Sequence, residues 1–131
     1  MTEWKWLTRE AIEIIHEEQI REHGGLAGIK DENALEASLA RPQHKDSYRE
    51  PDVSDLAAAY LYAIARNHPF SDGNKRTGYL AAYAFLRIHG QEVTADNGTI
   101  YGFVMGVAAG EIDEAGAAAF FRDHIETIEK R

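Results

Sequence analysis

Residues 78–86, with the sequence GYLAAYAFL, carry no formal charge, and this run constrains the fold more than any other part of the chain. A helix that is apolar on every face has to lie inside a core. The run therefore predicts a buried central helix from Asn74 to about His89, closed by Gly90 in the left-handed conformation that often ends a helix. A second uncharged run, residues 56–65, predicts another helix that is mostly buried.

Capping residues place the other helix boundaries. Ser, Thr and Asp favour the position before a helix, because their side chains accept hydrogen bonds from its free N–H groups. Suitable residues precede five segments, which predicts helices over residues 9–23, 32–41, 53–67, 97–109 and 114–128; the caps are Thr8, Asp31, Asp52, Asp96 and Asp113. No strand pair is expected. Together with the central helix, this predicts an all-α fold of about six helices in a single domain, residues 1–131.

Three further expectations concern packing. Pro42 should end the second helix, because the residue before a proline avoids the α region. The polar stretch 43–51 should then be a mobile surface loop, either a plain connector or a flap beside a functional site. In the first helix the apolar stripe is expected at Ala11, Ile12, Ile14 and Ile15, and in the fifth the glycines should let another backbone approach: Gly102, Gly106 and Gly110.

Composition narrows the class of protein. The chain has no cysteine, so it has neither a disulfide framework nor thiolate chemistry, which fits a cytoplasmic location. The N-terminus lacks the apolar segment of a signal peptide, and no uncharged run is long enough to span a membrane. A net charge of -8 argues against direct nucleic-acid binding, because such binding depends on neutralising phosphates.

The predicted central helix carries an unusual first turn. Helix N-termini favour acidic residues, because their free N–H groups and dipole present partial positive charge. Here Lys75 and Arg76 stand in the first turn instead. The arrangement is favourable if an anion such as a phosphate binds there, and Gly73 would let the backbone come close to it. The alternative is that both side chains simply point into water.

The loop before this helix concentrates reactive side chains. His68 could act as a general base near neutral pH, or only stabilise the end of the preceding helix. Asp72 could hold Mg²⁺ through its carboxylate, or cap the next helix. Asn74 could donate to a phosphate or cap locally, and Phe70 should anchor the loop in the core. Lys75 does not belong to a P-loop, and no pair of histidines has zinc-ligand spacing.

The segment HPFSDGNKRT, residues 68–77, resembles the signature of the Fic/Doc family, and more closely that of its Doc (death-on-curing) branch. Lys75 stands where the general Fic pattern has a glycine, and Tyr79 stands where it has a second arginine; both departures match the Doc form. The likeness covers roughly residues 8–125, and it includes HGGLAGIKD at 23–31, FLRIHG at 85–90 and AAGEI at 108–112.

The resemblance implies an all-α toxin of a toxin–antitoxin pair, neutralised by an antitoxin whose C-terminal segment folds onto it. It implies a kinase that moves the γ-phosphate of ATP to a threonine of elongation factor Tu and stops translation. The roles it implies are a base (His68), an Mg²⁺ ligand (Asp72), phosphate-binding residues (Gly73, Asn74, Lys75 and Arg76) and supports of the loop (Phe70 and Arg66). Two alternatives stay open: AMP transfer, as in Fic enzymes, and a catalytically silent binding module.

Overall fold

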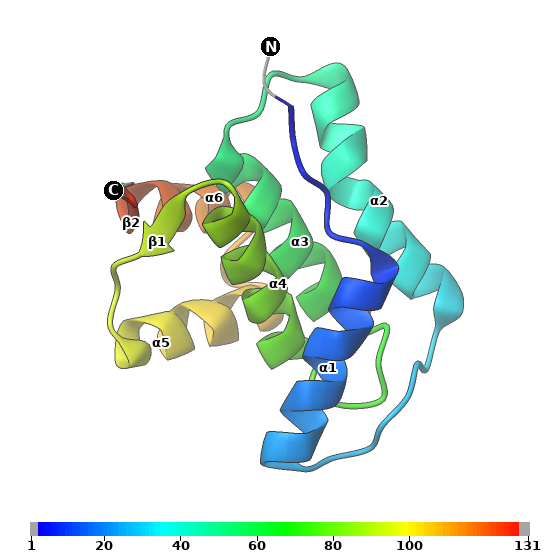
Figure 1. Cartoon of the computed structure of the whole chain (residues 1–131). Helices are drawn as coiled ribbons and strands as arrows, with labels where there is room; N and C mark the ends of the chain where they lie inside the picture. Colours follow the sequence, from blue (N-terminus) through cyan, green and yellow to red (C-terminus); the bar gives the residue numbers. More distant parts are fainter. Residues whose placement is uncertain (1–2, 129–131) are drawn as a thin grey trace.

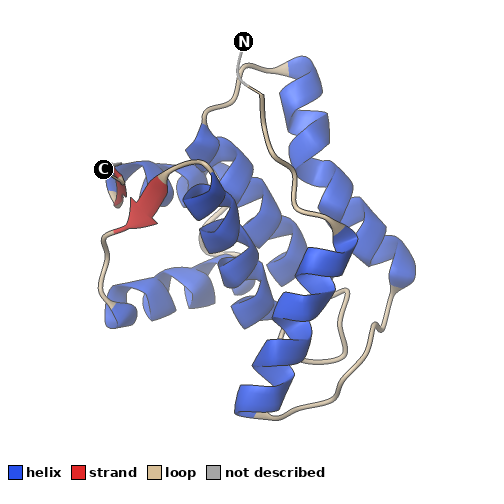
Figure 2. Ribbon diagram, viewed as in Figure 1, coloured by secondary structure: helices blue, strands red, loops and turns tan. Residues whose placement is uncertain are grey.

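The computed structural model describes residues 3–128 and shows six helices with one short strand pair (Figures 1 and 2). The elements are α1 (Arg9–His23), α2 (Glu32–Tyr48), α3 (Val53–Asn67), α4 (Asn74–Ile88), β1 (Gln91–Val93), α5 (Asn97–Ala108), α6 (Glu114–Asp123) and β2 (Ile125–Thr127). The predicted all-α class is confirmed. Over the described residues, the helices are too short or too polar to cross a bilayer.

The most deeply buried element is α3, which packs against α2, α4, α5 and α6. Its approach to α4 is close, because a Cβ on Gly78 would lie 3.2 Å from the main-chain oxygen of Leu61. The predicted central helix, α4, is buried along one side through residues such as Ala81 and Phe85. Tyr79 and Leu80 on its other side are half-buried and line a groove, so α3 rather than α4 is the central helix.

The predicted caps are confirmed. The side chains of Thr8, Asp31, Asp96 and Asp113 each accept a hydrogen bond from a main-chain N–H in the first turn of the helix that follows. Asp52 forms a full capping box at the start of α3, because its carboxylate accepts from the N–H of Asp55 and its own N–H donates to the Asp55 carboxylate. These contacts act within three residues, which explains why the sequence locates the helix starts so well.

The prediction that Pro42 ends the second helix is wrong, and the surface loop predicted at 43–51 is wrong for residues 43–48, which are helical. Helix α2 continues through Pro42 to Tyr48. Tertiary contacts compensate for the missing N–H: the Pro42 ring is buried, and Lys45, 7% exposed, forms an ion pair with Glu114 of α6. Nearby, the indole N–H of Trp4 donates to Asp46. Residues 43–48 therefore join α2 to the N-terminal segment and to α6.

The prediction that the chain has no strand pair is also wrong. Strands β1 and β2 pair antiparallel, with Gln91 opposite Thr127. Each strand has three residues, too few to show an alternating pattern. The last helix ends at Asp123, so the stretch predicted as its final turn is β2. The glycines predicted to let another backbone approach the fifth helix do not do so. Gly102 faces open space, Gly106 contacts the side chain of Ile112, and Gly110 lies beyond the end of α5, against the side chain of Arg66.

The inward face of α1 differs from the predicted apolar stripe. Ile14 is 57% exposed, whereas the buried residues are Ile12, His16 and Gln19 at helical spacing. Of the polar members of this face, His16 hydrogen-bonds the main-chain oxygen of Asp72 in the loop before α4, and Gln19 lies beside the first turn of α4. Burial on α1 was therefore decided by what the helix packs against rather than by hydrophobicity alone.

Candidate active site

His68 stands where α3 ends and the 68–73 loop begins. It is the C-cap of α3, and its main-chain N–H donates to Ile64 at 3.2 Å. Its backbone is left-handed, with φ 50° and ψ 57°, and within the described chain it is the one non-glycine residue with positive φ. An L-residue pays about 1–2 kcal/mol for this conformation. The side chain is exposed, so this strained backbone holds an imidazole in contact with solvent at the start of the 68–73 loop.

Phe70 and Asn74 hold the loop from the core side. Phe70 is 1% exposed, as an anchor should be. The Asn74 side chain accepts from the Phe70 N–H at 3.0 Å and donates to the Phe70 carbonyl at 3.0 Å. Of the two roles predicted for Asn74, its side chain therefore performs local capping. The second Nδ2–H and the main-chain N–H of Asn74 have no partner among the described residues, so either can donate to a phosphate.

A second segment, residues 26–31, pairs with the loop along its length. The Ser71 N–H donates to Gly28, and the N–H groups of Lys30 and Asp31 both donate to the Pro69 carbonyl, at 2.8 and 3.1 Å. An isolated antiparallel bridge joins Ile29 to Phe70. The loop is thus held in one conformation by main-chain contacts on one side and by the Asn74 side chain on the other.

Asp72 does not cap α4, because Gly73 is the N-cap residue and no side chain caps this helix. Instead its Oδ2 accepts from the Leu26 N–H at 2.7 Å, and Oδ1 has no hydrogen-bond partner among the described residues. No cluster of three acidic, His or Cys side chains surrounds it in residues 3–128. One exposed carboxylate with a free oxygen fits Mg²⁺, which proteins often hold through one or two carboxylates plus substrate phosphates.

The N-terminus of α4 is open. Its N-cap is Gly73, with φ 77° and no side chain to satisfy the first-turn N–H groups. Lys75 and Arg76 are exposed, and neither forms an ion pair with any other described residue. Two cations and unpaired N–H groups therefore occur together at the positive end of the helix dipole, which is a favourable site for a phosphate group.

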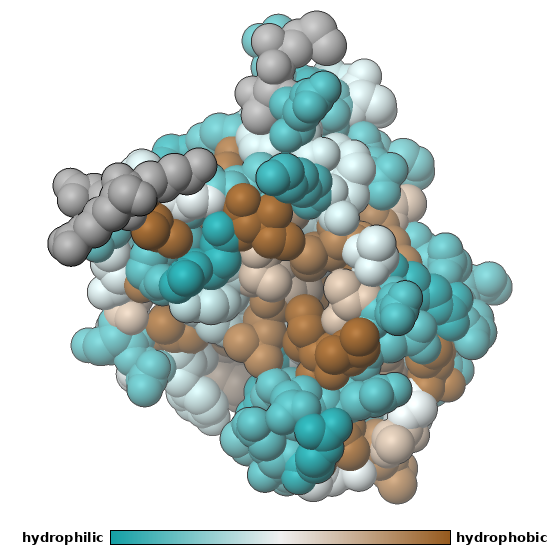
Figure 3. All heavy atoms as spheres, in the orientation of Figure 1, coloured by the Kyte–Doolittle hydropathy of each residue, from teal (hydrophilic) through white to brown (hydrophobic). Residues whose placement is uncertain are grey.

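A groove of about 540 Å³ begins at this helix end and runs between α1, α4 and α5. Its polar end holds Gly73, Asn74, Lys75 and Arg76, and the remaining lining is Gln19, Tyr79, Leu80, Asn97, Ile100, Tyr101, Val104 and Met105. Apolar side chains gather over α4 at the middle of this face, within a hydrophilic surround (Figure 3). A cationic end joined to an apolar wall suits a ligand with phosphates at one end and a flat, weakly polar group at the other.

Tyr79 stands on the α4 wall of this groove. Burial, with the neighbouring Tyr83 and Glu92, raises the pKa of Tyr79 to about 12, so the side chain is neutral near pH 7. Tyr79 therefore contributes an apolar ring and a hydroxyl to the groove, and no charge.

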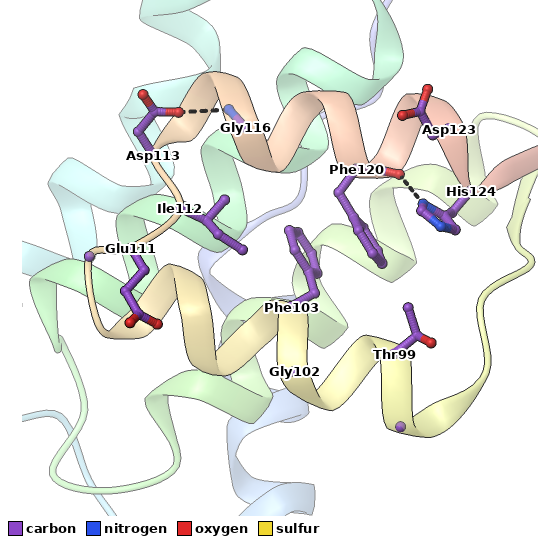
Figure 4. A pocket seen from close by; sticks show the side chains of 12 residues that line it. Thr99, Gly102, Phe103, Glu111, Ile112, Asp113, Gly116, Phe120, Asp123 and His124 are labelled. Atoms are coloured by element: carbon purple, nitrogen blue, oxygen red, sulfur yellow. Dashed lines mark hydrogen bonds between the residues drawn. The ribbon is translucent and has the colours of Figure 1, made fainter.

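A second hollow, of about 780 Å³, lies between α5 and α6 (Figure 4). Its floor includes the stacked rings of Phe103 and Phe120, 3.8 Å apart, and its acidic residues are Glu111, Asp113 and Asp123. No Lys or Arg lines it. Negative charge without a compensating cation repels phosphates, so this hollow is not a second nucleotide site.

Arg66 was expected to support the 68–73 loop, but its guanidinium donates to the Ala108 carbonyl at 2.9 Å and lies against Gly110. It therefore stabilises the C-terminal end of α5, where a cation complements the dipole. Sequence reasoning also missed His16, Gln19 and Leu26, of which Leu26 acts through its main-chain N–H. The available signal was the i, i+3 pair of polar residues, His16 and Gln19, on the face of α1 that carries Ile12.

The sequence was compared with known protein families and with individual proteins. Residues 6–86 match the model of the Fic/DOC family. The chain is 36% identical over 117 residues to "Protein kinase doc" of Escherichia phage P1, covering 88% of this chain and 92% of that protein. It is 46% identical over 77 residues to "Toxin Doc" of Mycolicibacterium smegmatis (strain ATCC 700084 / mc(2)155), covering 56% and 58%. The chain therefore belongs to the Fic/Doc family, within its Doc branch.

Proposed function

We propose that this chain is the toxin of a toxin–antitoxin pair and a kinase that transfers the γ-phosphate of ATP to a protein hydroxyl. The observation that carries the proposal is the open N-terminus of α4, with Lys75 and Arg76 in its first turn, directly after a rigid loop that bears His68 and Asp72. The relative called "Protein kinase doc" supports the same chemistry. The Doc resemblance makes a threonine of elongation factor Tu the first target to test. It also implies that the protein acts in the cytoplasm.

In this proposal the residues divide the work of phosphoryl transfer, which depends mainly on positioning and on charge neutralisation. Lys75, Arg76 and the first-turn N–H groups of α4 bind the phosphates. Asp72 would hold Mg²⁺, which when bound neutralises phosphate charge and orients the γ-phosphate. Asn74 and Phe70 keep the loop in place while the nucleotide binds.

His68 is the proposed general base. Its exposed ring nitrogen accepts the proton of the target hydroxyl as that oxygen bonds to the γ-phosphorus. The bond from the γ-phosphorus to the β–γ bridging oxygen breaks at the same time, and ADP leaves with that electron pair. The left-handed backbone of His68 points to a side chain that is held for a task, because strain of this kind is usually kept at functional sites.

Phosphate transfer is preferred to AMP transfer because of the charge pattern on α4. Fic enzymes have a second arginine at the position of Tyr79, and Tyr79 is neutral here and cannot make a bidentate contact to phosphate. The cations that line the groove, Lys75 and Arg76, both stand in the first turn of α4, next to the loop. The terminal phosphate rather than the α-phosphate is then expected to face His68.

The antitoxin is proposed from the same resemblance, as a small protein whose C-terminal segment folds onto the toxin. Co-expression with the product of a neighbouring small reading frame should restore growth to cells that express the chain.

Labelled ATP distinguishes the alternatives. Purified protein is incubated with elongation factor Tu and ATP carrying ³²P at either the γ- or the α-position. We expect label from γ-³²P-ATP only, and a target mass increase equal to one phosphate. Label from α-³²P-ATP, with the mass increase of AMP, would replace the kinase by an AMP transferase. If neither label enters any protein of a whole lysate, the chain is a binding module without this activity.

A further inference from the structure

His16 of α1 makes two contacts with the 68–73 loop, although 56 residues separate it from Asp72. Its imidazole stacks on the Phe70 ring, with centroids 3.8 Å apart and planes at 8°. Its Nε2 lies 2.8 Å from the main-chain oxygen of Asp72. A carbonyl oxygen can only accept, so Nε2 carries the hydrogen and donates it. The side chain is 3% exposed, so water does not replace this contact readily.

The bond from His16 determines the orientation of the peptide between Asp72 and Gly73. In a trans peptide the C=O and the N–H point in opposite directions, so fixing the Asp72 oxygen toward α1 directs the Gly73 N–H away from it. Gly73 lacks a side chain and tolerates either sign of φ, so the chain there does little to resist a rotation of this peptide. The hydrogen bond from His16 therefore selects one of two accessible orientations.

The same contact bears on the Asp72 carboxylate. Oδ2 accepts from the Leu26 N–H at 2.7 Å, just after the end of α1. A Cβ on Gly25 would lie 3.1 Å from the Cβ of Asp72, so the turn after α1 fits closely against this residue. Asp72 is thus held at its main-chain oxygen by α1 and at its carboxylate by the turn that follows α1, which leaves Oδ1 free.

A plain packing role would not require histidine here. Phenylalanine would keep the stacked ring but could not donate, and glutamine would place a donor near the Nε2 position but could not stack. Histidine supplies both contacts at one buried position.

We infer that His16 is a positioning residue of the phosphate-transfer site, which orients the Gly73 N–H and the free oxygen of Asp72 toward a magnesium–nucleotide ligand. The inference deepens the proposed function and rests on it for the identity of that ligand. Its first test needs no ligand.

In the free protein, His16→Phe keeps the stack and removes the donor, and His16→Gln is the matched variant that keeps a donor. Amide hydrogen exchange by NMR should show the Leu26 N–H exchanging about five- to tenfold faster in His16→Phe, as expected for the loss of about one net hydrogen bond. Exchange in α3 should stay unchanged, and His16→Gln should stay close to wild type. Unchanged protection of Leu26 in His16→Phe, or faster exchange spread equally over α1 and α4, would overturn the inference.

The second test adds Mn²⁺ with the non-hydrolysable analogue AMP-PNP and follows paramagnetic broadening of the Leu26 and Gly73 amides. Loss of a residue that orients a metal ligand typically weakens metal binding by about 10–100-fold, and we expect this in His16→Phe but not in His16→Gln. Equal binding by both variants and wild type contradicts the inference. If wild-type protein shows no broadening, the proposed function fails, and the Leu26 exchange rates still decide whether His16 positions Asp72.

Discussion

Replacing His68 by glycine should raise the stability of the protein while removing its activity. The His68 backbone has φ 50°, a conformation that costs a non-glycine residue about 1–2 kcal/mol. Glycine avoids that cost but loses about 0.5–1 kcal/mol through the extra freedom of its unfolded chain. The side chain is exposed and makes no hydrogen bond with the described residues, so its removal forfeits little.

The difference predicts a free energy of unfolding about 0.5–1 kcal/mol higher for His68→Gly than for wild type. For a domain of this size that is a rise in Tm of roughly 2–4 °C. Urea denaturation of the free protein measures the first quantity and calorimetry the second. His68→Ala is the control, because alanine keeps the strain and should show no such gain.

Both variants should lose phosphate transfer, because removing a general base typically costs about 10²–10⁴ in rate. Cells expressing either variant should grow. The reasoning is refuted in two ways. A folded His68→Gly protein that still transfers phosphate or arrests growth removes His68 as the base. A His68→Gly protein that is less stable than His68→Ala shows that the left-handed backbone is not strained.

Four other single substitutions test the fold and the site. Lys75→Ala and Arg76→Ala should each weaken ATP·Mg binding in calorimetry while leaving the Tm of the free protein equal or higher, because each cation opposes the helix dipole by about 0.3–1 kcal/mol; unchanged ATP affinity in both contradicts the anion site. Lys45→Met should lower the free energy of unfolding, because it leaves the buried Glu114 carboxylate without its lysine partner. The loss should be at most about 3–5 kcal/mol, because Glu114 keeps its ion pair with Arg41 of α2. Adding Glu114→Gln should recover part of the loss, because it removes the buried charge. Gly78→Ala should destabilise the protein in urea despite a helix-propensity gain of about 1 kcal/mol, because the new Cβ meets the α3 main chain at 3.2 Å; a more stable variant would show that the two helices can separate freely.

The site was predictable as far as it is local. The loop and the first turn of α4 are contiguous in sequence, so His68, Phe70, Asp72, Lys75 and Arg76 could be named from the order of residues alone. What the sequence left open was what each polar group does. In the structure the Asn74 side chain bonds the N–H and the carbonyl of Phe70, four residues earlier, and the buried Phe70 ring anchors this turn in the core.

The sequence by itself determined the helix starts and the all-α class, because capping side chains act within three residues and uncharged runs demand burial wherever they occur. Only the tertiary structure decided the rest. Helix α2 continues beyond Pro42 because Lys45 forms an ion pair with Glu114 of α6, a helix far away in the sequence. The short strand β1 forms because it pairs with β2. His16 reaches Asp72 across 56 residues. Such contacts depend on how helices pack, and no local pattern encodes which distant partner a side chain will meet.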